Sequence, residues 1–206
     1  MNDIIDVLND KQKEAVLSTE GPCLVIAGAG SGKTKVLTHK IAYLMQEKNV
    51  KPWSILAITF TNKAANEMKE RVENLIGDVA KDMWIGTFHS ICVRILRRYI
   101  DRIGYSNDFT IYDTEDQKKL LKDVIKNLNL DPKMYKENAV LGKISDFKNK
   151  LVTTGEVAQM AQSDFKLLNL SKIYNNYQEA LKKNNALDFD DLIMKTVHLF
   201  RKCPEV

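Results

Sequence analysis

Cysteine is scarce in this sequence, and the three that occur, Cys23, Cys92 and Cys203, lie far apart. Their separations fit neither a zinc-ligand pattern nor a disulfide framework. We therefore expect reduced thiols and a cytoplasmic protein, because disulfides persist mainly in oxidising compartments. Long apolar runs are also missing, and the first residues are acidic rather than basic. The sequence thus predicts neither a membrane-spanning helix nor a signal peptide.

Internal repeats and low-complexity segments are likewise missing from the 206 residues, which are enough for one good-sized domain or two small ones. Glycine becomes rare after Gly104, while lysine and helical patterns increase. This change predicts a small helical subdomain over residues 110–185, inserted into a domain formed by residues 1–109 and 186–206. The net charge of +4 permits a nucleic-acid partner without requiring one.

Residues 23–34 combine a short apolar segment with a glycine-rich loop. The apolar part, residues 23–27, predicts a buried central parallel strand. The loop predicts inward-turned backbone N–H groups that hold phosphate, followed by a helix whose positive end favours the anion. Lys33 can reach the β- and γ-phosphates, and the Thr34 hydroxyl can ligate Mg²⁺. The loop comprises Ala27, Gly28, Ala29, Gly30, Ser31, Gly32, Lys33 and Thr34. Alone, this motif indicates a purine nucleotide with magnesium.

Two further apolar segments, residues 55–58 and 84–86, predict strands that alternate with helices. This alternation favours a parallel sheet, and such sheets bind ligands at the carboxyl ends of their strands. We therefore expect Lys33, Phe60 and His89 to lie on one rim of the sheet.

Gln12 has two interpretations. It stands three residues after Asn9, where a capping box places glutamine, at the start of an amphipathic helix that continues through Val16 and Leu17. A carboxamide can also donate to and accept from the edge of an adenine ring. The local pattern alone favours the cap.

The predicted helices of residues 110–185 are rich in lysine, for example Lys143, Lys148 and Lys150. Lysines on such faces most often form solvated helix surface. Contact with a nucleic-acid backbone is the alternative.

A phosphate-binding loop that hydrolyses ATP also needs an acidic residue at the end of a second strand. The nearest match is residues 109–113, but we interpret them as a short edge segment whose Asp113 and Thr114 cap the next helix. No predicted strand precedes the acidic group formed by Asp188, Asp190 and Asp191, and no arginine finger is evident. The sequence therefore predicts that the catalytic half of the site is missing.

Five motifs follow one another in an order that resembles the UvrD/PcrA-like superfamily 1 DNA helicases over essentially the whole chain. They are residues 8–12, 27–34, 58–65, 87–90 and 187–192. In that family a loop that opens with alanine is usual, as with Ala27 here. The resemblance implies an α/β fold, a RecA-like P-loop NTPase sheet with an inserted all-helical subdomain near the DNA duplex. Residues 110–185 would form this subdomain, and the rest would form the first part of the motor domain.

The resemblance also assigns roles to residues. It implies that Gln12 holds the adenine of ATP, that Lys33 is the catalytic phosphate lysine and that Thr34 binds Mg²⁺. Two motifs match segments that touch single-stranded DNA: Phe60, Thr61, Asn62, Lys63, Thr87, Phe88, His89 and Ser90. The chemistry agrees, since an exposed aromatic ring lets a base stack without reading sequence.

Members of this family are longer, and their Asp-Glu motif lies beyond the position of Val206. The resemblance therefore implies an N-terminal fragment of an ATP-dependent 3′-to-5′ DNA helicase of repair and replication. We expect the fragment to bind ATP and single-stranded DNA, including single-strand/duplex junctions, with little or no turnover. Two alternatives remain open: a non-catalytic, nucleotide-gated DNA-binding module, and a small kinase-like enzyme that would use Asp113 or Asp190 for Mg²⁺. The sequence does not indicate a protein partner.

Overall fold

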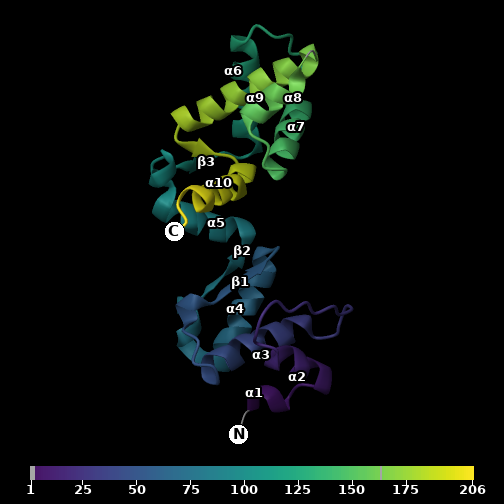
Figure 1. Ribbon diagram of the computed structural model, residues 1–206, viewed down its shortest axis with the longest axis vertical. Helices are drawn as coiled ribbons and strands as arrows, with labels where there is room; N and C mark the ends of the chain where they lie inside the picture. Colours follow the sequence, from purple (N-terminus) through teal and green to yellow (C-terminus); the bar gives the residue numbers. More distant parts are fainter. Residues whose placement is uncertain (1–2, 163) are drawn as a thin grey trace. The chain divides into compact units, whose positions relative to one another are not determined.

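The structure, a computed structural model, describes residues 3–162 and 164–206. The chain divides into two compact units, the first ending at Ile91 and the second running from Cys92 to Val206. The division falls within helix α5 (Phe88–Tyr99) (Figure 1). The proposed boundaries of the helical subdomain stay a prediction. Among the described helices, none is both long and apolar enough to cross a membrane.

The first unit is built around a small parallel sheet. Strand β1 (Leu56–Thr59) pairs in parallel with β2 (Trp84–Thr87), and the strands predicted at 55–58 and 84–86 are thereby confirmed. Helix α4 (Asn62–Ile76) connects the two strands and buries Met68 and Val72 against them. The remaining elements are α1 (Asp3–Asp6), α2 (Asp10–Leu17), α3 (Lys33–Gln46), η1 (Pro52–Ser54) and η2 (Gly77–Asp82).

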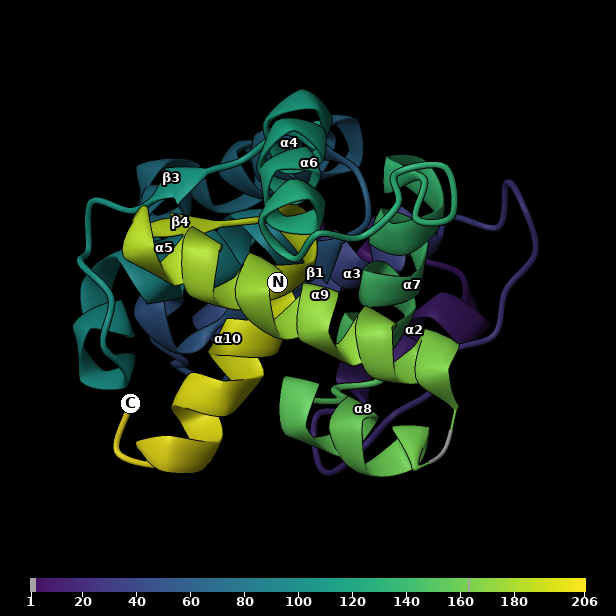
Figure 2. The ribbon, with the colours of Figure 1, turned by 90° about the horizontal axis from the view of Figure 1, so that it is seen from above.

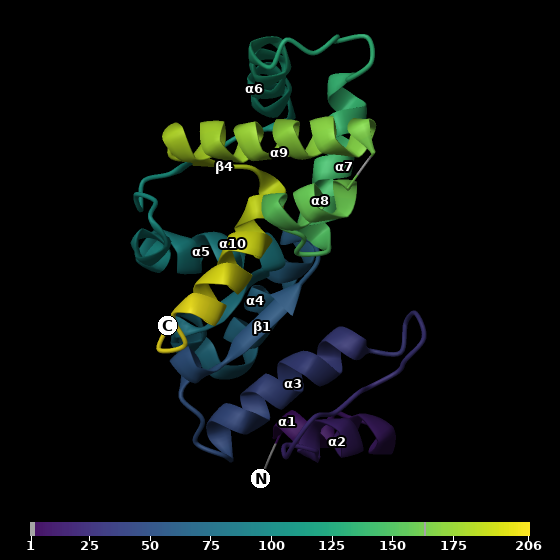
Figure 3. The ribbon, with the colours of Figure 1, turned by 45° about the horizontal axis from the view of Figure 1, so that its top comes forward.

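The strand predicted at residues 23–27 does not form. This segment runs as an extended loop between α2 and α3 (Figures 1 and 3). Leu24 is 86% exposed and Ile26 is 89% exposed, so the expected burial is also wrong. A strand satisfies its backbone N–H and C=O groups only through a neighbouring strand. The described residues supply no such neighbour, so an apolar run that is typical of a buried strand remains without regular structure.

The second unit consists mainly of helices beside a short parallel ladder. Strand β3 (Thr110–Ile111) pairs with β4 (Ala186–Leu187). Its helices are η3 (Ile100–Ile103), α6 (Thr114–Asn127), α7 (Glu137–Asn149), α8 (Thr154–Ala161), α9 (Phe165–Lys183) and α10 (Phe189–Lys202). Helix α9 packs against α6 and α8 (Figures 2 and 3). Its buried Tyr174 and Tyr177 join Leu121 and Ile144 in the core of these helices.

Several element boundaries differ from the expectation. Residues 109–113 do form a short edge segment, but Asp113 is the N-cap of α6 and Thr114 is already helical. The Asp113 carboxylate accepts from the backbone N–H groups of Glu115 and Asp116, at 2.8 and 2.9 Å. A strand does precede Asp188, contrary to the prediction. The sequence did not reveal β4 because two residues are too few to show a periodic pattern. Helix α9 begins at Phe165, after its cap Asp164.

Lys148 is not part of a solvated face, as was expected for the lysines of this region. Its side chain is fully buried, and its ammonium lies 2.6 Å from Asp188 Oδ2 and 3.1 Å from Asp191 Oδ1. The Tyr177 hydroxyl donates to the same Asp188 oxygen at 3.0 Å. A buried ammonium needs nearby counter-charges, and these carboxylates provide them. Lys143 and Lys150 are exposed, as expected.

We expect Lys148→Met to lower the free energy of unfolding by about 3–5 kcal/mol, because Asp188 and Asp191 would stay buried without their counter-charge. Lys150→Met, at an exposed position just beyond the same helix, should change it by less than about 0.5 kcal/mol. Urea unfolding followed by circular dichroism measures both values. Equal stabilities of the two variants would show that the buried charges do not hold this unit together.

Candidate functional site

The glycine-rich loop uses its glycines at two positions. Gly30 and Gly32 have φ angles of 75° and 83°, in the left-handed region that favours glycine. Gly28 and Ala27 do not adopt a positive φ, so alanine fits the first position of the loop without strain. The Ser31 hydroxyl donates to the Gly28 carbonyl at 2.7 Å and closes the turn. Helix α3 follows directly, as predicted.

The N-terminus of α3 has no side-chain cap. Its N-cap is Gly32, whereas Asn9 caps α2 and Thr61 caps α4 through side-chain oxygens. The first N–H groups of a helix have no partners within the helix, and the helix dipole makes this end positive. An uncapped helix start next to a glycine loop therefore fits a phosphate group, which would accept hydrogen bonds from these N–H groups.

Lys33 lies over the loop. Its ammonium donates to the Gly28 carbonyl at 2.6 Å and to the Ala27 carbonyl at 3.2 Å. A phosphate oxygen is a stronger acceptor than a carbonyl, so the ammonium can exchange these bonds for contacts to an anion. Thr34 stands in the first turn of α3, and its hydroxyl is the oxygen type that Mg²⁺ prefers. These residues fit a nucleotide with magnesium.

Gln12 makes the capping box and also contacts the loop. Its Oε1 accepts from the Asn9 N–H at 3.1 Å, and its own N–H donates to Asn9 Oδ1 at 2.9 Å. Its Nε2 donates to the Ser31 carbonyl at 3.1 Å. The predicted cap is therefore confirmed, and the same side chain stands beside the phosphate-binding loop. Contact with adenine stays a prediction.

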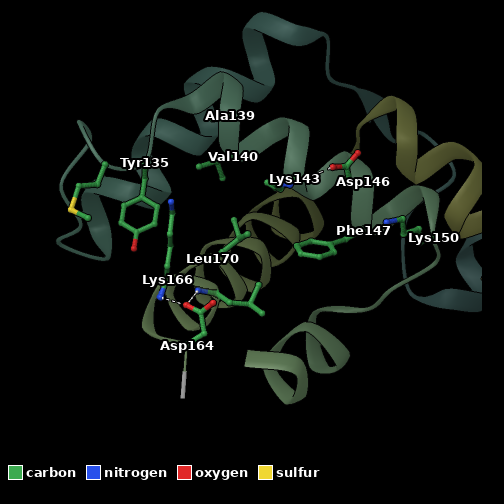
Figure 4. A pocket seen from close by; sticks show the side chains of 12 residues that line it. Tyr135, Ala139, Val140, Lys143, Asp146, Phe147, Lys150, Asp164, Lys166 and Leu170 are labelled. Carbon is green, nitrogen blue, oxygen red and sulfur yellow. Dashed lines mark hydrogen bonds and ion pairs between the residues drawn. The ribbon is translucent and has the colours of Figure 1, made fainter. Parts of the chain in front are cut away.

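One hollow lies next to the glycine-rich loop and another lies in the second unit. The first has a volume of about 410 Å³ and is lined by Val25, Lys33 and Val36. The second is larger, about 510 Å³, and lies between α7 and the start of α9 (Figure 4). Its walls include Val140 and Phe147, and much of the lining is apolar. The volumes of the hollows do not indicate which of them would hold a nucleotide. The N–H groups that fit a phosphate lie in the glycine-rich loop and at the start of α3.

Two aromatic rings meet at the carboxyl ends of the parallel strands. Phe60 follows β1 and Phe88 follows β2, and their ring centroids are 5.7 Å apart. The register sets Thr59 opposite Thr87, which brings the following residues side by side. Phe60 is 89% exposed and Phe88 is 44% exposed. Phe60 thus lies on one rim of the sheet with Phe88, the residue directly before His89. Lys33 follows no strand in the structure, so its expected place on this rim is not confirmed.

The hydroxyl groups near the rings shape the helix starts. Thr61 Oγ1 accepts from the Ala64 N–H at 3.1 Å and caps α4. The Thr87 N–H donates to Ser90 Oγ at 2.8 Å, and the two hydroxyls lie 3.1 Å apart. These groups therefore position the exposed side chains of the same motifs, which are those of Asn62, Lys63, Phe88 and His89.

Gly86 is a residue of this region whose role the sequence did not reveal. A Cβ at this position would lie 2.5 Å from Ser90 Oγ and 3.2 Å from Ile91 Cδ1. Glycine therefore allows the start of α5 to pack tightly against β2. A glycine within an apolar strand often marks a place where another segment approaches the backbone closely. This pattern is the signal by which the sequence could have revealed the role of Gly86.

The acidic residues considered for Mg²⁺ are largely engaged elsewhere. Asp113 caps α6, and Asp188 and Asp191 hold the Lys148 ammonium. Within residues 3–162 and 164–206, no three His, Cys, Asp or Glu side chains gather closely enough to hold a metal ion. Of the two carboxylates that the kinase-like alternative would use, Asp113 is therefore engaged in a cap, and the alternative through Asp190 stays a prediction.

Comparison with known proteins gives a consistent result. The UvrD/REP helicase N-terminal domain matches residues 8–206. The chain is 55% identical over 206 residues to the ATP-dependent DNA helicase PcrA of Staphylococcus aureus and 56% identical over 205 residues to that of Bacillus subtilis. In both comparisons all of this chain is covered, but it spans only 28% of the relative's length.

We expect Gly32→Ala to lower the free energy of unfolding by about 1–2 kcal/mol, because alanine disfavours a left-handed backbone. Its Cβ would also lie 2.7 Å from Gln12 Nε2. Gly28→Ala is the matched control, since a Cβ there meets no atom within 4 Å and the backbone is not left-handed. Thermal unfolding compares the two variants. A loss of the same size in Gly28→Ala would contradict the loop geometry.

Proposed function

The chain belongs to the UvrD/REP helicase N-terminal domain family, and from this premise we propose that it is the ATP-binding and single-stranded-DNA-binding part of a longer ATP-dependent DNA helicase. The uncapped start of α3 behind the left-handed glycines carries the proposal. This helix end offers N–H groups to a phosphate, and Lys33 and Thr34 are the first two residues of the same helix.

In the proposed complex, the residues of the loop bind the nucleotide. The N–H groups after Gly32 would hold the phosphates, and Lys33 would move its ammonium from the Gly28 carbonyl to a phosphate oxygen. Thr34 would ligate Mg²⁺, which neutralises phosphate charge when bound. Gln12 stands next to Ser31 and would contact the adenine with the amide that now donates to the loop.

The proposed DNA contact centres on the two rings. Phe60 protrudes almost completely into solvent, and a neighbouring Phe88 supports it. A base can stack on such a ring whatever its identity, and the charge of Lys63 attracts the backbone phosphates. Asn62 and His89 lie on the same two motifs and are exposed. This chemistry supports binding of single strands and of single-strand/duplex junctions without sequence preference.

We propose that the chain has a RecA-like P-loop architecture, in which residues 23–27 lead into the phosphate-binding loop as an extended segment. Residues 1–109 and 186–206 would then belong to the first motor domain, and residues 110–185 to the helical subdomain. The parallel pairing of β1 with β2 agrees with this architecture.

For the whole protein we propose ATP-driven 3′-to-5′ movement along DNA in repair and replication, in the cytoplasm. The chain itself would bind without appreciable turnover, because the acidic groups considered for Mg²⁺ are largely engaged in caps and ion pairs. Movement in this direction requires a 3′ single-stranded tail. We therefore expect the longer protein to unwind a duplex with a 3′ tail and not one with a 5′ tail.

We expect Lys33→Ala to weaken binding of a fluorescent ATP analogue at least about tenfold, because the ammonium's contact to phosphate is lost. Lys48→Ala, exposed just beyond the end of α3, should bind like the parent chain. Fluorescence titration measures both, and phosphate release measures turnover. Hydrolysis by the parent chain that disappears in Lys33→Ala would contradict the proposed lack of turnover.

We expect Phe60→Ala to weaken binding of single-stranded DNA by about 1–3 kcal/mol, the contribution of one stacked base. Trp53→Ala is the matched control, because Trp53 is another exposed aromatic residue of the same unit, at 64% exposure, outside the DNA motifs. Fluorescence anisotropy with oligonucleotides of mixed sequence measures the affinity. Equal losses in the two variants would show that Phe60 has no specific role.

A further inference from the structure

Backbone groups hold the side-chain amide of Gln12 at both ends. Its Oε1 accepts from the Asn9 N–H at 3.1 Å, and its Nε2 donates to the Ser31 carbonyl, also at 3.1 Å. Asn9 stands at the start of α2, and Ser31 belongs to the glycine-rich loop. A backbone N–H only donates and a carbonyl only accepts, so these two partners fix one orientation of the amide and oppose the orientation turned by 180°.

The cap of α2 also holds the backbone of Gln12. The Gln12 N–H donates to Asn9 Oδ1 at 2.9 Å, and the two residues together form the capping box. The Asn9 side chain therefore fixes the first turn of the helix, which carries the amide. Removing this side chain loosens that turn, whereas another capping side chain, such as that of serine, keeps it.

Gly32 leaves room for the amide beside the loop. A Cβ at this position would lie 2.7 Å from Gln12 Nε2, so a side chain on Gly32 would displace the amide. Gly32 is the N-cap of α3, the helix whose first N–H groups are proposed to hold the phosphates. The amide thus lies next to the place proposed for the nucleotide.

Both ends of the amide keep one bonding position for a further partner. A carboxamide has two lone pairs on its oxygen and two N–H groups on its nitrogen, and the bonds to Asn9 and Ser31 use one of each. An acceptor beside a donor, in a fixed order, is what remains. Adenine presents the matching pair on one edge, with N6–H₂ as donor and N7 as acceptor. Guanine presents two acceptors there, O6 and N7, so Oε1 would face O6.

We propose that Asn9 is a positioning residue that makes the nucleotide site select adenine over guanine, because it holds the Gln12 amide in one orientation together with the Ser31 carbonyl. This inference rests on the proposed function, in which Gln12 contacts the base. An amide that rotates freely would turn its N–H groups toward the acceptors of guanine. In the fixed amide the same turn breaks the bonds to Asn9 and Ser31. The selectivity therefore depends on the cap of α2 as well as on Gln12 itself.

The test measures the affinity of the 206-residue chain for ATP and for GTP with Mg²⁺, by competition with a fluorescent ATP analogue labelled on its ribose. We expect ATP to bind at least about tenfold more tightly than GTP, as one bidentate base contact provides. Asn9→Ala should lower this ratio at least about threefold, because the cap is lost. Asn9→Ser keeps a capping oxygen and should retain the ratio of the parent chain. Gln12→Ala should bring the two affinities close together.

Tripolyphosphate has no base, so its affinity separates an effect on the amide from damage to the loop. Asn9→Ala should bind tripolyphosphate like the parent chain, because Lys33 and the start of α3 are unchanged. If this variant lost as much affinity for tripolyphosphate as for ATP, the role of Asn9 would be structural and the proposal would be wrong.

Two other results would overturn the proposal while leaving nucleotide binding intact. They are equal affinities of the parent chain for ATP and GTP, and an unchanged ratio in Asn9→Ala. A ratio that falls as far in Asn9→Ser as in Asn9→Ala would also contradict it, because the cap would then not be the cause. Absence of Lys33-dependent binding of ATP, GTP and tripolyphosphate alike would contradict the proposed function, and this inference with it.

Discussion

A buried ammonium ion holds the second unit together. Lys148 on α7 reaches the two carboxylates that begin α10, so the helix that carries the lysine is tied to the segment directly after β4. Asp188 and Asp191 also form the capping box of α10, with the Asp191 N–H donating to Asp188 Oδ1 at 2.9 Å. Burial raises the pKa of Asp191, and the Lys148 charge opposes the rise. The same two carboxylates therefore start a helix and neutralise a buried cation.

Helix starts set the geometry of the first unit in a comparable way. Asn9 and Thr61 satisfy the first N–H groups of α2 and α4 with their own side chains. Gly32 cannot do so for α3, and its left-handed backbone directs the loop across that helix end. The first N–H groups of α3 thus have no side-chain cap, unlike those of α2 and α4. The contact from Gln12 to Ser31 links this open end to α2.

Local patterns predicted much of this arrangement, and non-local contacts explain what they missed. The cap at Asn9, the strands of the first sheet and the start of α3 have recognisable local sequence patterns, and all are confirmed. Lys148 looked like any surface lysine because its partners stand far along the chain. The pairing of β3 with β4 was also missed, because the two strands stand far apart in the sequence and two residues show no periodicity.

Residues 23–27 have no regular structure, in contrast to the glycine-rich loop that follows them. The exposed Leu24 and Ile26 side chains of this segment are unfavourable in water. Yet the loop after it already has its left-handed glycines, because α3 is held independently. The Lys35 and Lys40 ammonium groups donate to the carbonyls of Val7 and Ala15, at 2.6 and 3.2 Å. The N-terminal segment therefore holds α3 through contacts that do not involve residues 23–27.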